Sequence, residues 1–246
     1  MKGVEHMISD LYVRQARINQ SSIPEPRRYP FTLPVIRHIH QIDFKSKVTF
    51  FVGENGTGKS TLLEAIAANF GFNPEGGSRN FNFSTQASHS ELYEYMTLVK
   101  GARRPKDGFF LRAESFYNVA TEVDQLAAAQ SYGGKSLHAQ SHGESFMSLL
   151  LHRFWGDGFY ILDEPEAALS PSRQFSLIAR MDQLVKQNSQ FIIATHSPIL
   201  LAYPGADIYV LSEEGLTQTP YESTEHYLLT KAFLNNPQGI LGELID

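Results

Sequence analysis

Short apolar runs alternate with amphipathic segments along this chain of 246 residues. The β-branched and aromatic run 48–52 predicts a buried strand, and residues 60–70 place their apolar side chains on one helical face before Gly71. Further on, the runs 159–162 and 191–195 predict two more buried strands, with an amphipathic helix over 172–187 between them. This strand–helix rhythm is typical of an α/β protein with a largely parallel sheet.

Weaker patterns fill the rest of the chain. We expect a strand over 8–18, a proline-bearing connection over 19–34, loops over 71–85 and 101–109, helices over 91–100 and 144–155, a hairpin over 208–219 and a closing helix over 224–235. The expected architecture is one α/β domain over 1–246. It has a central, mostly parallel sheet flanked by helices, an N-terminal antiparallel β region, and an inserted helical lobe over roughly 85–156.

Composition excludes several classes of protein. The chain has no cysteine, which rules out a disulfide-built scaffold, and its apolar runs are too short for a signal peptide or a membrane span. We therefore expect a cytoplasmic protein without membrane insertion. The net charge is −5, with basic residues concentrated near the N-terminus and acidic ones near the C-terminus. Such asymmetry permits a basic face for an anionic partner, but a merely solvated surface is the favoured interpretation.

The segment Gly53–Ser60 fits the pattern G-x-x-x-x-G-K-[ST] and lies between a predicted strand and a predicted helix. Small residues at these positions let backbone N–H groups surround a phosphate at the positive end of the helix. Lys59 then reaches the β- and γ-phosphates, and the Ser60 hydroxyl is a ligand for Mg²⁺. The expected ligand is a nucleoside triphosphate with magnesium, bound by Gly53, Asn55, Gly56, Thr57, Gly58, Lys59, Ser60 and Thr61. A plain glycine turn is the alternative.

Polar residues also end the two later strands. Asp163 and Glu164 follow the run 159–162, which suits a metal-side carboxylate followed by a base that orients water. His196 follows the run 191–195. Acidic residues at the end of a strand are often only solvent-exposed loop residues, and a lone histidine is often a surface residue. Because ligands of open α/β sheets bind at the carboxyl ends of the strands, we expect all three side chains in one crevice.

The segment Ser141–Glu144 precedes an apolar helix and matches a capping box. Taken by itself, the segment is more typical of a plain helix cap, but a capped helix start with a glycine is also what a second phosphate-binding surface looks like.

The order of these motifs resembles the ATP-binding cassette (ABC) ATPases over nearly the whole chain. The resemblance implies that Gly53–Ser60 is the Walker A loop, that Ser141–Glu144 is the signature, that Asp163 and Glu164 are the Walker B acid and catalytic base, that 168–170 is the D-loop, and that His196 is the switch histidine. It also implies ATP as ligand and a head-to-tail homodimer, in which Ser141, Gly143 and Glu144 complete the partner's site. Where the family has a metal-sensing glutamine, this chain offers Glu114.

Within the family, Asn55 and the S-x-G-E form are similar to the chromosome-maintenance, recombination and phage-defence branch, which includes small stand-alone predicted ATPases often filed as AAA-family. Transporter signatures usually read L-S-G-G-Q. The expected fold is thus a P-loop NTPase of ABC type.

The expected function is Mg²⁺-dependent ATP hydrolysis, with residues Lys59, Glu164 and His196 as catalytic groups and Ser60, Asp163 and Glu114 as metal-side groups. Turnover would drive an effector protein or a nucleic-acid process. A transporter ATP-binding subunit and a slow nucleotide switch are the alternatives, and a kinase or GTPase does not account for S-x-G-E and His196. Candidate phosphate contacts to nucleic acid are Arg27, Arg28, Arg103, Arg104 and Lys106, and candidate adenine contacts are Tyr12, Arg14 and Arg17.

Overall fold

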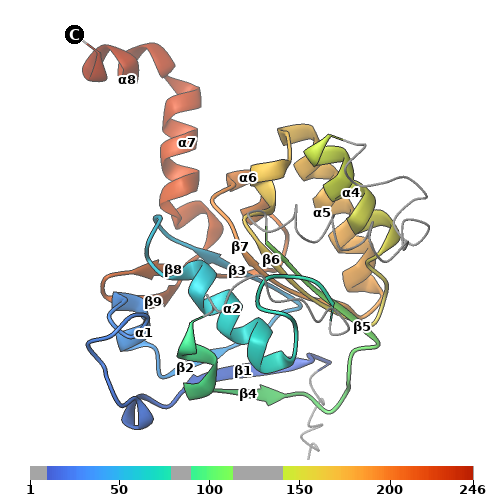
Figure 1. Cartoon of the computed structure of the whole chain (residues 1–246). Coiled ribbons are helices and arrows are strands. Elements are labelled where there is room, and N and C mark those ends of the chain that lie inside the picture. Colours follow the sequence, from blue (N-terminus) through green and yellow to red (C-terminus); the bar gives the residue numbers. More distant parts are fainter. Residues whose placement is uncertain (1–9, 79–89, 113–140, 246) are drawn as a thin grey trace, which may run out of the picture.

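A computed structural model describes residues 10–78, 90–112 and 141–245. Its centre is a six-stranded sheet with the order β5-β6-β7-β3-β8-β9 (Figure 1). The strands are β3 (Val48–Val52), β5 (Asp107–Arg112), β6 (Gly158–Asp163), β7 (Gln190–Ala194), β8 (Asp207–Ser212) and β9 (Gly215–Gln218). All neighbours pair in parallel except β8 and β9, which form an antiparallel hairpin. The carboxyl ends of β6, β7 and β3 are therefore adjacent.

A second sheet of three antiparallel strands has the order β2-β1-β4. Its strands are β1 (Val13–Ile18), β2 (Gln41–Asp43) and β4 (Met96–Lys100). The predicted N-terminal antiparallel β region is confirmed.

Two hydrophobic clusters lie on opposite faces of the central sheet. Alternate side chains of β3 divide between them, so that Phe51 packs in the first cluster while Phe50 and Val52 pack in the second. The first cluster contains α2 (Lys59–Phe70) and the antiparallel sheet. The second contains α4 (His142–His152), α5 (Pro171–Lys186) and α6 (Pro198–Leu201). The helix after the glycine loop and the helix after Ser141 thus cover different faces.

The C-terminal helices α7 (Glu225–Asn235) and α8 (Pro237–Leu244) project from the body of the molecule (Figure 1). Neither helix has a buried residue, and seven large apolar side chains of this arm are exposed: Leu228, Leu229, Phe233, Leu234, Leu241, Leu244 and Ile245. No helix in the described ranges is both long and apolar enough to cross a bilayer.

The helix predicted over 91–100 is wrong. This segment is a short 3₁₀ helix (Glu91–Tyr95) followed by β4, in which Met96 and Leu98 are buried and Thr97 is exposed. That alternation has the period of a strand, and pairing with β1 satisfies its backbone groups.

The loop predicted over 101–109 ends early, because β5 begins at Asp107 and joins the edge of the central sheet. Residues 34–38 and 41–43, inside or beside the predicted connection, form helix α1 (Pro34–His38) and β2. The closing helix predicted over 224–235 matches α7, and Pro237 then begins a further helix, α8, that the sequence pattern did not predict. Of the helical lobe expected over 85–156, residues 85–89 and 113–140 lie outside the described residues, and the described part contains β4 and β5 as well as α4. The lobe as a unit stays a prediction.

Candidate functional site

The glycine loop joins β3 to α2, as the sequence pattern requires. Gly58 is the residue before α2 and has a left-handed φ of 103°. A Cβ atom at this position would lie 3.1 Å from Val35 Cγ1 and 3.2 Å from Leu33 Cδ1. Both the backbone angle and the close approach of α1 therefore favour glycine. The free N–H groups of the first turn of α2 face the loop, which is the arrangement that binds phosphate.

Lys59 is buried, with 4% of its surface exposed. Its Nζ donates hydrogen bonds to the carbonyl oxygens of Gly53 at 2.7 Å and Glu54 at 3.0 Å. Burial lowers the pKa of Lys59, and the nearby carboxylate of Glu164 acts in the opposite direction. The ammonium group is thus held inside the loop, where an anionic ligand can replace the carbonyl oxygens.

Ser60 and Asp163 come from different elements and meet at the carboxyl edge of the sheet. The Ser60 hydroxyl donates to Asp163 Oδ1 at 3.1 Å. On its other side, Asp163 Oδ2 lies 3.6 Å from Nε of Arg112 at the end of β5, and Arg112 Nη1 lies 3.0 Å from Glu64 Oε2. One hydroxyl and one carboxylate are the hard oxygen ligands that Mg²⁺ uses beside a phosphate. The described residues contain no cluster of three or more His, Cys, Asp or Glu that could hold a metal, so Mg²⁺ here would also need phosphate and water oxygens.

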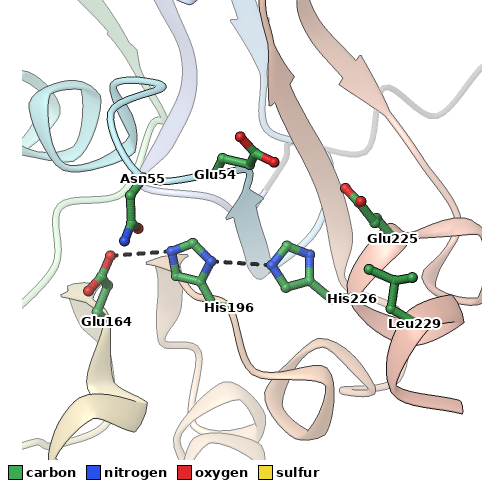
Figure 2. Close-up of a pocket in the computed structure, with 7 residues that line it drawn as sticks. All are labelled: Glu54, Asn55, Glu164, His196, Glu225, His226 and Leu229. Atoms are coloured by element: carbon green, nitrogen blue, oxygen red, sulfur yellow. Dashed lines mark hydrogen bonds and ion pairs between the residues drawn. The ribbon is translucent and has the colours of Figure 1, made fainter. Parts of the chain in front are cut away.

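Glu164, His196 and His226 form a chain of three polar side chains (Figure 2). Glu164, directly after β6, has left-handed backbone angles (φ 51°, ψ 53°). Its Oε1 lies 3.5 Å from His196 Nε2, and His196 Nδ1 lies 3.2 Å from Nε2 of His226 on α7. Burial lowers the pKa of both histidines, and the Lys59 ammonium lowers that of His196 further. Both imidazoles are therefore neutral near pH 7.

Glu166 fixes the backbone of this histidine. Its Oε1 accepts a hydrogen bond from the His196 N–H at 2.5 Å, and burial raises the pKa of the Glu166 carboxyl. Apart from the acidic character of the segment after Glu164, no pattern in the sequence signals this contact. No sequence pattern signals His226 either, because its position depends on where the fold places the start of α7.

Two neighbouring cavities open at this edge of the sheet. The first, of about 300 Å³, is lined by Tyr29, Leu33, Asn55, Gly56, Gly58, Lys59, Ser60, Thr61 and Glu164. The second, of about 560 Å³, is lined by Glu54, Asn55, Glu164, His196, Glu225, His226 and Leu229 (Figure 2). Asn55 and Glu164 line both, so the two cavities share a border. The crevice expected from the strand ends brings Lys59, Ser60, Asp163, Glu164 and His196 together.

Ser141 caps α4 at a different place in the fold. Its backbone N–H and its hydroxyl both donate to Glu144 Oε2, at 3.0 and 2.7 Å. A Cβ atom on Gly143 would lie 2.3 Å from Arg173 Nη1 and 2.9 Å from the carbonyl oxygen of Ala168, so α4 approaches α5 closely through this glycine. Among the described residues, neither cavity lining includes Ser141, Gly143 or Glu144. The capping box is present, and its residues lie apart from the glycine loop of the same chain.

Comparison with known proteins agrees with these motifs. Residues 32–123 match the model of the AAA domain, and residues 146–201 match the AAA ATPase domain. The energy-coupling factor transporter ATP-binding protein EcfA2 of Methanospirillum hungatei is 27% identical over 242 residues, covering 85% of this chain but only 58% of that protein. The cobalt import ATP-binding protein CbiO of Salmonella typhimurium is 25% identical over 231 residues, covering 82% of this chain and 83% of that protein. The chain is therefore similar to ATPase domains of the ABC type.

A solved structure of cbiO1 from Clostridium perfringens, described as part of the ABC transporter complex cbiONQ, aligns with 96% of this chain and 99% of that chain. The identity is 19% and the TM-score 0.48.

The three residues predicted for adenine contact do not line either cavity. Tyr12 is buried, and Arg14 and Arg17 are exposed residues of β1 in the antiparallel sheet. Tyr29, which lies in the predicted proline-bearing connection, lines the smaller cavity instead. Its side chain is 59% exposed, and its hydroxyl lies 3.2 Å from Thr61 Oγ1.

Glu114, expected as a metal-side residue, lies outside the described residues. The basic loops are partly neutralised. Arg28 pairs with Glu91 at 2.9 Å, Arg103 with Asp10 at 3.4 Å, and Lys106 with Asp157 at 2.8 Å. These ion pairs weaken the case for a phosphate-binding patch in both loops.

Proposed function

We propose that this domain binds and hydrolyses ATP with Mg²⁺ at the edge formed by β3, β6 and β7. The observation that supports the proposal is the 3.1 Å hydrogen bond between Ser60 and Asp163, because a hydroxyl and a carboxylate this close together can serve one Mg²⁺. When bound there, Mg²⁺ offsets the negative charge of the phosphates.

The roles of the remaining residues follow from their positions. Lys59 binds the β- and γ-phosphates in exchange for its loop carbonyls. Glu164 faces the same cavity and orients the attacking water. His196 donates from Nε2 toward the γ-phosphate side, where it stabilises the position of the transferred group. Tyr29 offers an exposed aromatic face at the mouth of the cavity, which suits stacking on the base.

The active form that we propose is a head-to-tail homodimer. The N-terminus of α4 packs on the sheet face opposite α2, so within one chain Ser141, Gly143 and Glu144 stay away from the glycine loop. A second copy would bring its Ser141 to the open side of the phosphates and exclude water from them. This arrangement also gives a reason for the exposed position of Ser141.

Turnover by such a dimer would drive an effector protein or a nucleic-acid process. Phosphate release by the purified protein tests both parts of this proposal. It is measured with Mg²⁺ or with EDTA, and with or without duplex DNA at roughly 50 and 200 mM salt. Mg²⁺-dependent hydrolysis supports the ATPase proposal, and Asp163→Asn should remove that dependence. Stimulation by DNA that falls steeply with salt supports the nucleic-acid role, because binding to phosphates releases counterions. Stimulation equal at both salts would contradict that role.

A transporter subunit is the second candidate, favoured by the relatives, which are named as transporter and import ATP-binding proteins. Leu151, Trp155 and Phe175 are exposed apolar residues of the α4–α5 side and suit contact with another protein. Because Trp155 is the single tryptophan of the chain, its fluorescence reports burial of this side. Recovery of the protein with membranes, lost in Trp155→Glu, would favour this function over the first.

A further inference from the structure

The hydrogen bond between His196 and His226 joins the proposed active site to the projecting helix α7. The two ring nitrogens are 3.2 Å apart, and the rings lie at 47° with centroids 5.4 Å apart. The rings are therefore paired edge to edge through nitrogen and are not stacked.

The contacts of His196 decide which ring nitrogen carries its proton. Nε2 lies 3.5 Å from a carboxylate oxygen of Glu164, which can only accept. Within the described residues, this buried Nε2 atom has no hydrogen-bond partner of good geometry. A bare Nε2 would turn a lone pair toward the carboxylate and, in the proposed function, toward phosphate oxygens. Since the ring is neutral, a proton on Nε2 leaves Nδ1 as an acceptor.

His226 is placed to supply the matching donor. Its Nε2 atom is the group that faces His196 Nδ1, so it must carry a proton if Nδ1 has none. The opposite arrangement, with the proton on His196 Nδ1, would leave the Nε2 lone pair facing Glu164. His226 Nε2 therefore donates to His196 Nδ1, and His196 Nε2 donates into the cavity.

The first turn of α7 is fixed although the rest of the helix is exposed. The Thr224 side chain accepts from the N–H of Tyr227 at 3.4 Å and donates to the carbonyl of Tyr221 at 2.7 Å. The Tyr221 hydroxyl donates to the carbonyl of Pro198, two residues after His196. Hence these hydrogen bonds tie the first turn of α7, which carries His226, to the segment that follows His196.

We propose that His226 is a positioning residue that holds His196 in its Nε2–H tautomer, so that His196 donates into the ATP cavity. The effect on turnover rests on the proposed function, whereas the tautomer itself does not. A histidine that loses this partner can rotate or change tautomer and then offers a lone pair where a donor is needed.

The direct test is ¹⁵N NMR of the histidine rings of the wild-type protein without nucleotide. We expect His196 to show a protonated Nε2 and a bare Nδ1, and His226 a protonated Nε2. A protonated His196 Nδ1 overturns the proposal whether or not the protein hydrolyses ATP. If instead the tautomer is as expected and no hydrolysis is seen, only the proposed function fails.

The kinetic test compares His226→Ala with His226→Gln. Loss of the donor should lower kcat about tenfold with little change in KM, because a misplaced group costs rate more than binding. Glutamine keeps an N–H donor of similar reach and should restore most of kcat. Leu234→Ala is the control, since Leu234 is an exposed residue of the same helix and lines neither cavity. Equal rates for the wild type and His226→Ala contradict the proposal.

A double mutant separates positioning from a direct role. If His226 acts through His196, His196→Ala and the double mutant His196→Ala/His226→Ala should have the same kcat. An additive loss would show that His226 acts on its own. Thermal unfolding of each variant checks the fold, and if His226→Ala does not fold, the ¹⁵N result and the glutamine variant still decide.

Discussion

Ser60 and Asp163 are 103 positions apart in the sequence and are joined by a hydrogen bond of 3.1 Å. The strand order explains this contact. β7 lies between β3 and β6, so the glycine loop and the acidic strand end border the same narrow edge, with His196 between them. Substitutions along this edge are expected to divide into those that abolish nucleotide binding and those that abolish only cleavage.

Lys59→Ala should abolish ATP binding or turnover. The ammonium is buried among loop carbonyls, and its loss removes the charge that faces the phosphates. We expect kcat/KM to fall by roughly 100-fold or more, measured by phosphate release and by binding of a fluorescent ATP analogue. Lys186→Ala is the control, because Lys186 is exposed and pairs with Asp182 one turn away on α5. Undiminished hydrolysis by Lys59→Ala would reject the assigned role.

Glu164→Gln should bind ATP and cleave it slowly. The amide keeps the size of the side chain but cannot take a proton from water, so kcat should fall by about 10²- to 10⁴-fold. ATP should then trap a dimer, visible by size-exclusion chromatography with light scattering. Glu214→Gln, in the exposed turn between β8 and β9, is the charge-matched control. A Glu164→Gln protein that hydrolyses at the wild-type rate counts against Glu164 as the base.

Ser141→Arg should block closure of the proposed dimer by size and charge. The sharper experiment mixes Ser141→Arg with Lys59→Ala, each inactive alone. In a head-to-tail dimer one of the two sites then combines an intact glycine loop with an intact Ser141, so mixing should restore part of the activity. If Ser141 served its own chain's site, mixing would restore none. Ser141→Thr keeps the helix cap and serves as the control for folding.

Stability should fall in mildly acidic solution, and His226 should account for part of the loss. Burial and the nearby His196 and Lys59 lower its pKa from the ordinary 6.5, while Glu225 acts the other way. The unfolded chain takes up a proton at His226 near the ordinary pKa of 6.5, whereas the folded protein does so only at a lower pH. The contribution of His226 to stability is therefore present above pH 6.5 and is lost as the pH falls from 6.5 through the pKa of the folded state. The raised pKa of Glu166 has the opposite effect, because it favours the folded state as the pH falls.

The measurement is Tm against pH for the wild type and for His226→Gln. The difference between the two curves isolates His226, because Glu166 is common to both. This difference in Tm should become smaller as the pH falls below 6.5, the ordinary pKa of the imidazole. A difference that stays constant from about pH 5 to 8 would show that His226 does not titrate as described.

The sequence was sufficient for the strands whose residues are buried on both faces. Val48–Val52 is apolar or β-branched throughout, and the strand has the predicted bounds. β5 was not recognised, because its first two residues, Asp107 and Gly108, are typical of a turn. In the fold a Cβ atom on Gly108 would lie 2.7 Å from the Phe72 ring, so the glycine serves packing.

The site was predictable where a motif is continuous in the sequence. The glycine loop is such a motif, and the acidic pair and His196 followed from the rule that ligands bind at the carboxyl ends of parallel strands. Tyr29 and His226 were not predictable, because they come from a connection and a late helix. Their places depend on how α1 and α7 pack, which no local pattern encodes.

The exposed apolar arm of α7 and α8 has a consequence for handling the purified protein. Seven large hydrophobic side chains in water favour self-association at high concentration, and sulfate or phosphate salts strengthen it. Aggregates of this origin need no nucleotide. Sedimentation profiles recorded with and without ATP, over a series of dilutions, therefore distinguish this self-association from an ATP-dependent dimer.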